Sequence, residues 1–357
     1  MSITKADILI DPSKIKNVKN PTEEMCLAAV RMNGHTLCYI ENPSKAVCME
    51  AVKRSPNALQ YVKNQDEEIC LEAVSRIGET LKYVKKQTPN ICYEAIRENS
   101  WAFRYVKEQT EELCELAVKK TPLLIAEVKD QTAVLKRMAL NEDAMAIRFI
   151  RQPTVEDNLY AVQQNPMALK YIDNQTEEIC KEAVKRSVWA LGYVKNQTEE
   201  LCLFAVKQTP SAITEIRHPT PAVCYAALEK NGNVIKHIED PNDLYCKCAI
   251  ETDPMAIRYI KNPTEDVCLE AVKRNPDTLQ YIVRQTSAIC LAAVQKDGTA
   301  LRYVRNQTEA VIKAAMYQNP EAVSYISSKK ITGLDEYKKK QENPKIVSIK
   351  KKNSKHR

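Results

Sequence analysis

The chain has 357 residues, of which 44% are apolar, and its formal net charge is +7. This is enough apolar material for a large core, whereas a single globular domain of this length is unusual. No run of about eighteen apolar residues occurs, so no membrane span is indicated. The excess positive charge lies in residues 328–357, because the rest of the chain holds 42 basic and 43 acidic residues.

Residues 1–19 are predicted to form an N-terminal cap. Their apolar stretch is too short and too charged for a secretory signal, so we expect an intracellular protein. Residues 11–19 match the second half of the repeat described next, with Asp11-Pro12, Ile15 and Val18 at its marker positions. The array is therefore expected to begin with half a repeat.

Residues 20–327 consist of fourteen consecutive 22-residue repeats without an insertion. The tenth position is always Ala, the seventh is Cys in eleven repeats, and the twenty-first is always Val or Ile. A fixed period of this length is typical of repeat architectures. We predict an all-α fold, an α-solenoid of fourteen helix-turn-helix repeats. They begin at Asn20, Asn42, Asn64, Lys86, Glu108, Asp130, Gln152, Asn174, Asn196, His218, Asp240, Asn262, Arg284 and Asn306.

The repeat that starts at Asn262 shows how each repeat is expected to fold. Thr264 suits an N-cap, because its hydroxyl can accept from free backbone N–H groups, and the first helix should end near Arg274. An N-cap and a first helical proline then predict a second helix from Pro276 to Val283. Helices this short are marginal alone, so packing between repeats must stabilise them.

The invariant tenth residue gives this packing a physical reason. Alanine is small, so at the centre of the inner helix face it lets neighbouring helices approach closely. Ala183→Leu is expected to overpack this contact and to destabilise the chain by about 1–3 kcal/mol, measurable by thermal denaturation.

Residues 108–173 depart most from the pattern. Lys136, Asp157 and Asn158 place polar groups at positions that are apolar elsewhere, and Glu127 replaces a tyrosine. Drift in a tolerant array explains this most simply. The alternatives are a bend, a weak joint or a partner-binding region.

The cysteines at the seventh position are predicted to be buried apolar residues. Equivalent residues of adjacent repeats should lie about 8–10 Å apart, whereas a disulfide requires Cα atoms within about 7 Å and zinc requires four ligands around one point. We therefore expect neither a disulfide nor a metal site. These residues are Cys26, Cys48, Cys70, Cys92, Cys114, Cys180, Cys202, Cys224, Cys246, Cys268 and Cys290.

The sequence has no pattern typical of an active site. Its four histidines lack metal-binding or nucleophile spacing, and acidic pairs recur at helix starts, where they complement the helix dipole. No phosphate-binding loop or nucleophile motif occurs. We therefore expect no enzyme activity, no cofactor and no small-molecule substrate.

A row of tyrosines at the twentieth position is the candidate interaction surface. At 100° per residue they should flank the core rather than fill it. Tyrosine is common at binding hot spots, but rings that merely cover the joints between repeats are the simpler interpretation. The row comprises Tyr39, Tyr61, Tyr83, Tyr105, Tyr171, Tyr193, Tyr259, Tyr281, Tyr303 and Tyr325.

Basic residues follow the second helix in most repeats, and helix-dipole complementarity explains them more simply than a binding stripe. They are Lys63, Lys85, Lys107, Lys129, Arg151, Lys195, Arg217, Lys261 and Arg305.

Residues 328–357 form a basic tail that is expected to be disordered. It can serve as a nuclear-import signal, a nucleic-acid arm or an anchor on an acidic surface. Its lysine clusters are Lys338, Lys339, Lys340, Lys350, Lys351 and Lys352.

The phrases NQTEEIC-x-EAVKR and N-P-x-A-L-x-Y-V-K resemble the helical repeats called domain of unknown function 4116. The resemblance covers residues 11–327. It implies an origin in mimivirus-like giant viruses or their relatives and a site of action in the infected cell. It implies no catalytic or binding residue.

Three functions remain open at this point. The first is a scaffold for protein–protein interaction, with a host or viral partner, in the host cytoplasm or the virion. The second is nucleic-acid binding through the repeat surface and the basic tail, which also allows a nuclear location. The third is a structural virion component.

Overall fold

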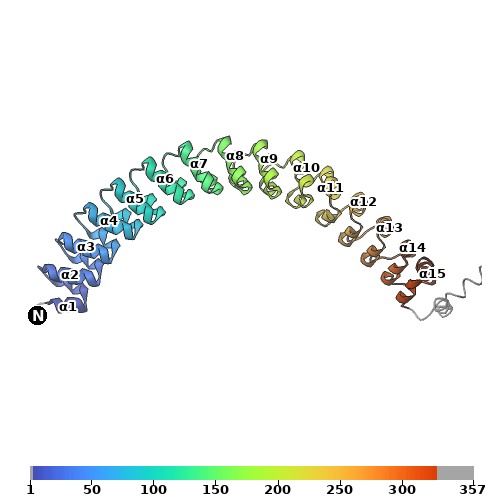
Figure 1. Ribbon diagram of the computed structural model, residues 1–357, viewed down its shortest axis with the longest axis horizontal. Coiled ribbons are helices and arrows are strands. Elements are labelled where there is room, and N and C mark those ends of the chain that lie inside the picture. The colour runs from blue at the N-terminus through green and yellow to red at the C-terminus, as the bar shows by residue number, and fades with distance from the viewer. Residues whose placement is uncertain (1–2, 328–357) are drawn as a thin grey trace, which may run out of the picture. The chain divides into compact units, whose positions relative to one another are not determined.

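The structure is a computed structural model and describes residues 3–327, most of which lie in short helices (Figure 1). Each complete repeat contains one α-helix, of ten residues in all repeats but one, followed by a six-residue 3-10 helix, written η. Residues 3–327 contain no strand. The predicted all-α repeat fold is therefore confirmed.

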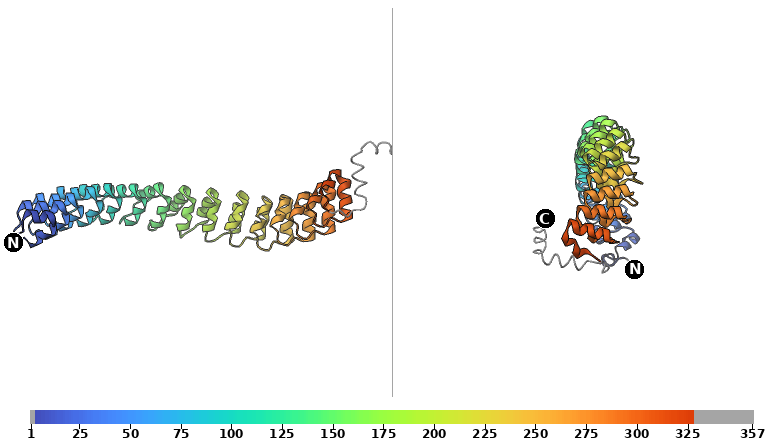
Figure 2. Two further views of the ribbon diagram at one scale, coloured as in Figure 1. Left: turned by 90° about the horizontal axis from the view of Figure 1, so that it is seen from below. Right: turned by 90° about the vertical axis from the view of Figure 1, so that its right-hand side faces the viewer.

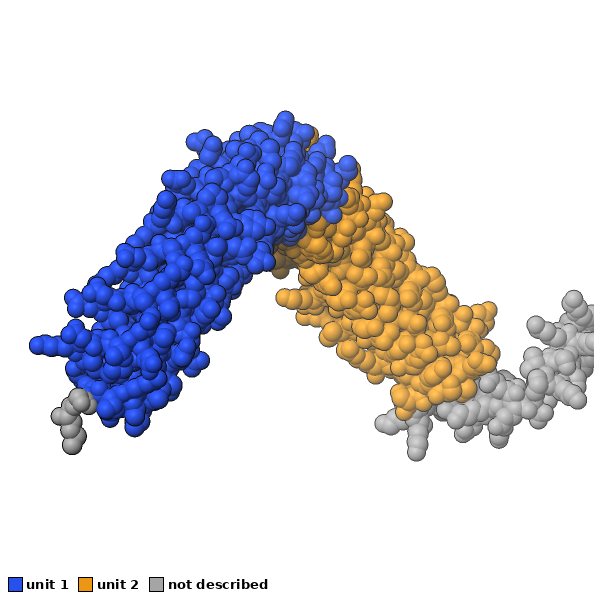
Figure 3. Space-filling view, turned by 60° about the vertical axis from the view of Figure 1, so that its left-hand side comes forward, with its two compact units in different colours: residues 1–186 blue, residues 187–357 orange. Residues whose placement is uncertain are grey.

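The chain divides into two units, residues 1–186 and 187–357, which Figure 3 distinguishes by colour. In the first unit the α-helices are α1 (Lys5–Ile10), α2 (Glu23–Met32), α3 (Lys45–Arg54), α4 (Glu67–Arg76), α5 (Pro89–Glu98), α6 (Glu111–Lys120), α7 (Ala133–Glu142), α8 (Val155–Gln164) and α9 (Glu177–Arg186). Its 3-10 helices are η1 (Pro12–Asn17), η2 (Gly34–Tyr39), η3 (Pro56–Tyr61), η4 (Gly78–Tyr83), η5 (Ser100–Tyr105), η6 (Pro122–Glu127), η7 (Ala144–Phe149) and η8 (Pro166–Tyr171).

The second unit continues the same alternation. Its α-helices are α10 (Glu199–Gln208), α11 (Pro221–Leu228), α12 (Asp243–Thr252), α13 (Glu265–Arg274), α14 (Ser287–Lys296) and α15 (Glu309–Gln318). Its 3-10 helices are η9 (Val188–Tyr193), η10 (Pro210–Glu215), η11 (Gly232–His237), η12 (Pro254–Tyr259), η13 (Pro276–Tyr281), η14 (Gly298–Tyr303) and η15 (Pro320–Tyr325).

Capping residues set the bounds of the α-helices. In α6 the Thr110 hydroxyl accepts from the Leu113 N–H at 3.4 Å, and the helix ends where Thr121 turns to an extended backbone. Such a cap satisfies a free N–H group at the helix start. Thr264 occupies the predicted N-cap of α13, but its hydroxyl donates to Asp243 of the preceding repeat at 2.9 Å instead.

The second helix of each repeat differs from the α-helix that the sequence predicts. It is a 3-10 helix, and η13 ends at Tyr281, two residues before the expected Val283. In so short a segment, i→i+3 bonding pairs more backbone groups than i→i+4 bonding, and 3-10 helices are used in short pieces. Ile282 then turns to an extended backbone, and its N–H donates to the Leu279 carbonyl at 3.2 Å.

Within each unit the helices form two layers, in which α-helices pack on α-helices of adjacent repeats and 3-10 helices pack on 3-10 helices. Figure 2 shows this stacking from two further sides. All fourteen tenth-position alanines have 0% exposure, as predicted. The close approach is visible at Gly78, where an added Cβ would lie 2.4 Å from the Ala95 carbonyl oxygen of the next repeat.

The N-terminal half-repeat is present as η1, and the short helix α1 precedes it. The side chains of Ile8 and Ile15 are buried at 0% and 1% exposure, so both helices join the core. The basic tail, residues 328–357, lies outside the described residues.

The departures in residues 108–173 leave the helices unchanged, because α7 and α8 each keep ten residues. Asp157 forms a reciprocal capping box with Thr154, which explains a polar residue there. Asn158 is buried at 3% exposure, and its Oδ1 has no hydrogen-bond partner. Burying such a group costs about 1–3 kcal/mol, so Asn158 stabilises α8 less than an apolar residue at this position would.

Candidate interaction surface

The seventh-position cysteines are buried and unpaired, as the sequence predicts. Burial raises the pKa of the Cys70 thiol to about 11, and the carboxylates of Asp66 and Glu67 act in the same direction. Its Sγ lies 3.9 Å from the Gln65 side-chain oxygen. A thiol with so high a pKa is not a nucleophile at neutral pH, so these cysteines serve packing.

Glutamines at the second position of eight repeats tie successive 3-10 helices together. The Gln87 amide nitrogen donates to the Leu81 carbonyl at 3.3 Å and to the Tyr105 carbonyl at 2.8 Å, and its oxygen accepts from the Lys107 N–H at 2.9 Å. One side chain therefore joins the ends of η4 and η5. We call this arrangement the glutamine clamp; its members are Gln65, Gln87, Gln109, Gln131, Gln175, Gln197, Gln285 and Gln307.

The basic residues that follow the 3-10 helices are largely used within the array. Lys107 Nζ donates to the Lys85 carbonyl at 3.0 Å, and Lys85 Nζ donates to the Lys63 carbonyl at 2.7 Å. The expected complement to the helix dipole therefore acts on the preceding repeat rather than on the residue's own helix. These contacts add a second tie between the ends of successive 3-10 helices.

The other six repeats carry proline at the second position, and two of these prolines line clefts. A cleft of about 690 Å³ is lined by Pro241, and one of about 680 Å³ by both Pro43 and Gln65, whereas the cleft lined by Gln87 measures about 370 Å³. Proline has no side-chain donor or acceptor, so the glutamine clamp cannot form. The six are Pro21, Pro43, Pro153, Pro219, Pro241 and Pro263.

The predicted tyrosine row lies beside the core, and none of its ten side chains is buried. Tyr39 is 48% exposed and Tyr281 is 38% exposed, while six others are half-buried. Each closes a 3-10 helix, so the row follows the 3-10 layer of each unit.

Cations interleave with these rings. Lys82 Nζ lies 5.0 Å from the centroid of the Tyr83 ring and 6.0 Å from that of Tyr105 in the next repeat. In the second unit, the Arg302 guanidinium lies 4.6 Å from the Tyr303 ring and 6.0 Å from the Tyr325 ring. Cations at such distances are attracted by the ring faces. At these two places a cation thus lies against the rings of two successive repeats, and Arg148 lies in the same way against the rings of Phe149 and Tyr171.

A family described as domain of unknown function (DUF4116) matches the chain at residues 44–87, 66–109 and 264–308. Residues 44–109 and 264–308 therefore carry DUF4116 repeats. Each match spans about two repeats, and the matches fall in both units, which confirms the resemblance seen in the sequence. No curated protein matches the chain.

The sequence interpretation missed two features of these DUF4116 repeats. One is the glutamine clamp, whose signal was that a basic residue stands twenty positions after seven of the eight glutamines but after only two of the six prolines. The other is the cation that stands directly before the tyrosine in several repeats, such as Lys82 before Tyr83 and Arg302 before Tyr303. Both signals lay in the variation among repeats rather than in their consensus.

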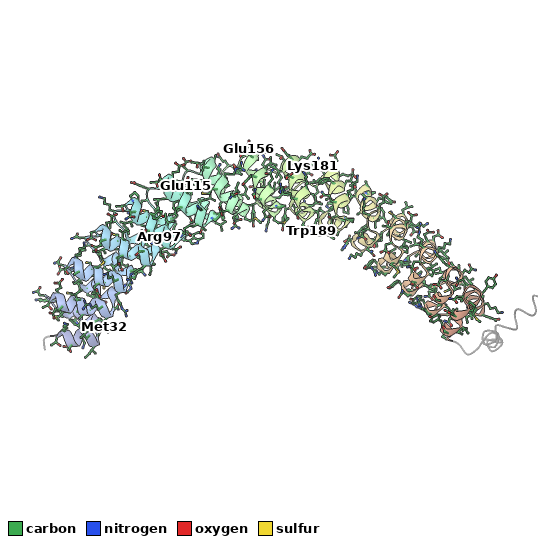
Figure 4. The ribbon with its side chains drawn as sticks, viewed as in Figure 1. Met32, Arg97, Glu115, Glu156, Lys181 and Trp189 are labelled. Atoms are coloured by element: carbon green, nitrogen blue, oxygen red, sulfur yellow. The ribbon has the colours of Figure 1, made fainter. Side chains whose placement is uncertain are left out.

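The α-helical layer of the DUF4116 array differs from the 3-10 layer. Glu115 of α6 and Glu156 of α8 point outward there, and Trp189 of η9 lies at the edge that carries the 3-10 helices (Figure 4). Arg76 pairs with Glu72 at 2.6 Å and Arg186 with Glu182 at 2.7 Å, each within one helix. Glu50 pairs instead with Arg31 of the preceding repeat at 3.2 Å.

Among residues 3–327, no group of three or more His, Cys, Asp or Glu side chains is arranged to hold a metal ion. No helix in that range is long and apolar enough to cross a membrane.

Proposed function

We propose that the chain is a non-catalytic scaffold that binds another protein along its 3-10 layer. The observation that carries the proposal is the alternation of tyrosine rings and cations over successive repeats. Repeat arrays present extended surfaces, and tyrosine and arginine are the residue types most enriched at binding hot spots. The partner is a host or viral protein inside the infected cell, in keeping with the family resemblance.

The 3-10 layer offers cations with which a partner's carboxylates can pair. Several arginines on the α-helices are neutralised within the array, as in the Arg274–Glu270 pair at 2.7 Å. Lys82 and Arg148 of the 3-10 layer instead contact rings and form no ion pair within residues 3–327. A partner's carboxylates can therefore pair with these two cations.

Nucleic-acid binding is the second candidate, supported by the same mixture of rings and cations. Single-stranded nucleic acids bind such surfaces by stacking bases on ring faces. Here the chain's own cations occupy positions over those faces, which favours a protein partner. A structural role in the virion remains a prediction.

Site-specific photo-crosslinking tests the proposal. A benzophenone amino acid placed at Tyr39 or Tyr281 is expected to give discrete protein adducts in infected cells, identified by mass spectrometry. The same group at Lys181 or Glu115, on the α-helical layer, is the matched control and is expected to give none. Equal adducts from both layers, or adducts only with nucleic acid, would contradict the proposal.

A further inference from the structure

Two adjoining clefts form a basic groove in the first unit. The cleft of about 680 Å³ beside Pro43 and the cleft of about 370 Å³ beside Gln87 share Lys85 and Lys86 in their linings. Lys63 lines the first cleft and Lys107 the second. We define the basic groove by these four lysines, which come from three successive repeats.

The groove lysines are held in place and face few carboxylates. The Nζ atoms of Lys63, Lys85 and Lys107 donate to backbone carbonyls of the preceding repeat, so their side chains are fixed. Of the acidic lining residues, Asp66 is neutralised by Lys45 at 2.8 Å. The remaining carboxylates are fewer than the lysines, and the groove is net positive.

The ring–cation alternation continues beside the groove. Lys82 and Arg104 belong to the 3-10 helices that end at Tyr83 and Tyr105. Lys82 Nζ lies between the two rings, so their centroids are roughly 11 Å apart at most. Contact with a ring orders a flexible cation before a ligand arrives, which lowers the entropy lost on binding.

We propose that the basic groove binds an acidic, extended segment of the partner protein, whose carboxylates are spaced by about three residues. An extended chain rises about 3.3 Å per residue, so three residues span about 10 Å, which lies within the upper limit for the separation of the Tyr83 and Tyr105 rings. The inference rests on the proposed scaffold function and adds the chemical nature of the partner.

A peptide fits the groove better than a single-stranded nucleic acid. Nucleic acids gain affinity from bases stacked on open ring faces, whereas Lys82 lies over those of Tyr83 and Tyr105. Carboxylates require only cations and hydroxyl donors, which the groove and the tyrosines supply.

The equivalent cleft of the second unit provides an internal control. The cleft beside Pro241 is lined by Lys236 and Lys261 but also by Glu239, Asp240 and Asp243. Its carboxylates outnumber its lysines, so an acidic segment should not bind there.

Fluorescence polarisation with the full chain tests the proposal. The probe is a labelled peptide with four glutamates at every third position. The comparison probes are a peptide of the same composition with its glutamates adjacent, and an oligothymidylate of similar charge. The spaced peptide is expected to bind at about 50 mM salt, to weaken as salt is added, and to exceed the adjacent-glutamate peptide by about tenfold in affinity.

The variant Lys82→Gln/Lys86→Gln should lower the affinity for the spaced peptide by at least about tenfold. Neither side chain bonds a backbone carbonyl, so the fold is expected to be kept, with circular dichroism as the check. The control variant, Lys236→Gln/Lys261→Gln, removes the same charge from the Pro241 cleft of the second unit and should leave the affinity unchanged.

Three results would overturn the inference: no binding of the spaced peptide, equal loss in both variants, or tighter binding of the oligothymidylate. Crosslinking of the 3-10 layer to a protein while the spaced peptide fails to bind would reject the acidic segment and leave the scaffold function standing. Absence of both would reject the two together.

Discussion

Between residues 64 and 151, a glutamine clamp joins the ends of successive 3-10 helices, whereas between residues 218 and 283 proline stands at the same position of every repeat. Both stretches have the same helix order and the same buried alanines. They differ in the ties: Gln131 makes three hydrogen bonds of 2.7 to 3.0 Å across its junction, and Pro241 has no side-chain group to make one. The core therefore sets the architecture, and the junction residue sets how firmly neighbouring repeats are held.

The comparison implies a stiffer first stretch and a softer second one. Repeat arrays are stabilised by terms within repeats and by terms between neighbours. The glutamine clamp belongs to the second kind, as do the lysines that reach back to the preceding repeat. Backbone amides that a clamp bonds, such as that of Lys107, should exchange more slowly with solvent than the amide of Lys261.

The largest difference is expected from removing the junction side chain. Gln87→Ala leaves the Tyr105 carbonyl and the Lys107 N–H without this partner and removes one of the two donors to the Leu81 carbonyl, so local stability should fall by about 2–4 kcal/mol. Pro241→Ala removes no hydrogen bond and should change local stability by less than about 1 kcal/mol. Hydrogen exchange followed by mass spectrometry measures both. Similar losses in the two variants would refute the clamp.

The glycine contacts give the next largest effect. An added Cβ would lie 2.4 Å from the Ala95 oxygen at Gly78 and 2.1 Å from the Ala249 oxygen at Gly232. Each Gly→Ala change should cost about 1–3 kcal/mol, because neighbouring backbones must move apart. Although Gly232 is the tighter site, Gly78→Ala should cost more if clamps resist that movement. Urea denaturation decides the order, and the reverse order would contradict a softer second stretch.

Smaller effects are expected from the lysines. Lys107→Met removes the Nζ bond to the Lys85 carbonyl and should lower stability by about 0.5–1.5 kcal/mol. Lys86→Met, beside it, removes a charge that bonds no carbonyl and should be nearly neutral. Thermal denaturation of the two variants compares them. Equal thermal midpoints of the two variants would show that the hydrogen bond from Lys107 Nζ to the Lys85 carbonyl does not stabilise the array.

The response to alkaline pH should differ least between the stretches. Burial raises the pKa of Cys70 in the first stretch and of Cys246 and Cys268 in the second to about 11. An unfolded cysteine has a pKa of about 8.5, so the folded state keeps its protons longer. The stability that these protonated thiols contribute should be fully present below about pH 8.5. It should be lost progressively as the pH rises to about 11.

Melting temperatures measured across this pH range test the effect in both stretches. Cys70→Ala and Cys268→Ala should each reduce the pH-dependent part of the loss by a similar amount. A loss that neither variant alters would assign it to other groups.

Most of the fold could be predicted from the sequence, because comparing the fourteen repeats shows which positions require a buried or a capping residue. The burial of the alanines and cysteines was predicted correctly, since it follows from residue type and period. Thr264 occupies its predicted N-cap position, but its hydroxyl does not make the predicted capping bond. The 3-10 form of the second helix was not predicted. Apolar spacing alone does not separate i→i+3 from i→i+4 bonding over six residues.

The candidate site was predicted only in part. The tyrosines stand out by their period, and their position beside the core follows from it. The glutamine clamp, and the contact of Lys82 with the Tyr105 ring, depend on residues about 20 positions apart, such as Gln87 and Lys107. A consensus sequence does not show which residues vary together. Here the second-position glutamine and the basic residue twenty positions later vary together, and they join one repeat to the next.

The lysine contacts give the array a polarity. A carbonyl at the end of a 3-10 helix receives its ammonium donor from the repeat that follows, as the Lys63 carbonyl does from Lys85. A deletion that removes the following repeat therefore leaves a backbone carbonyl without its ammonium donor. A deletion that removes the preceding repeat leaves only a lysine ammonium group without its acceptor, and water readily solvates that group. Deletions from the front should be tolerated better than deletions from the rear, and unravelling should begin at the trailing end.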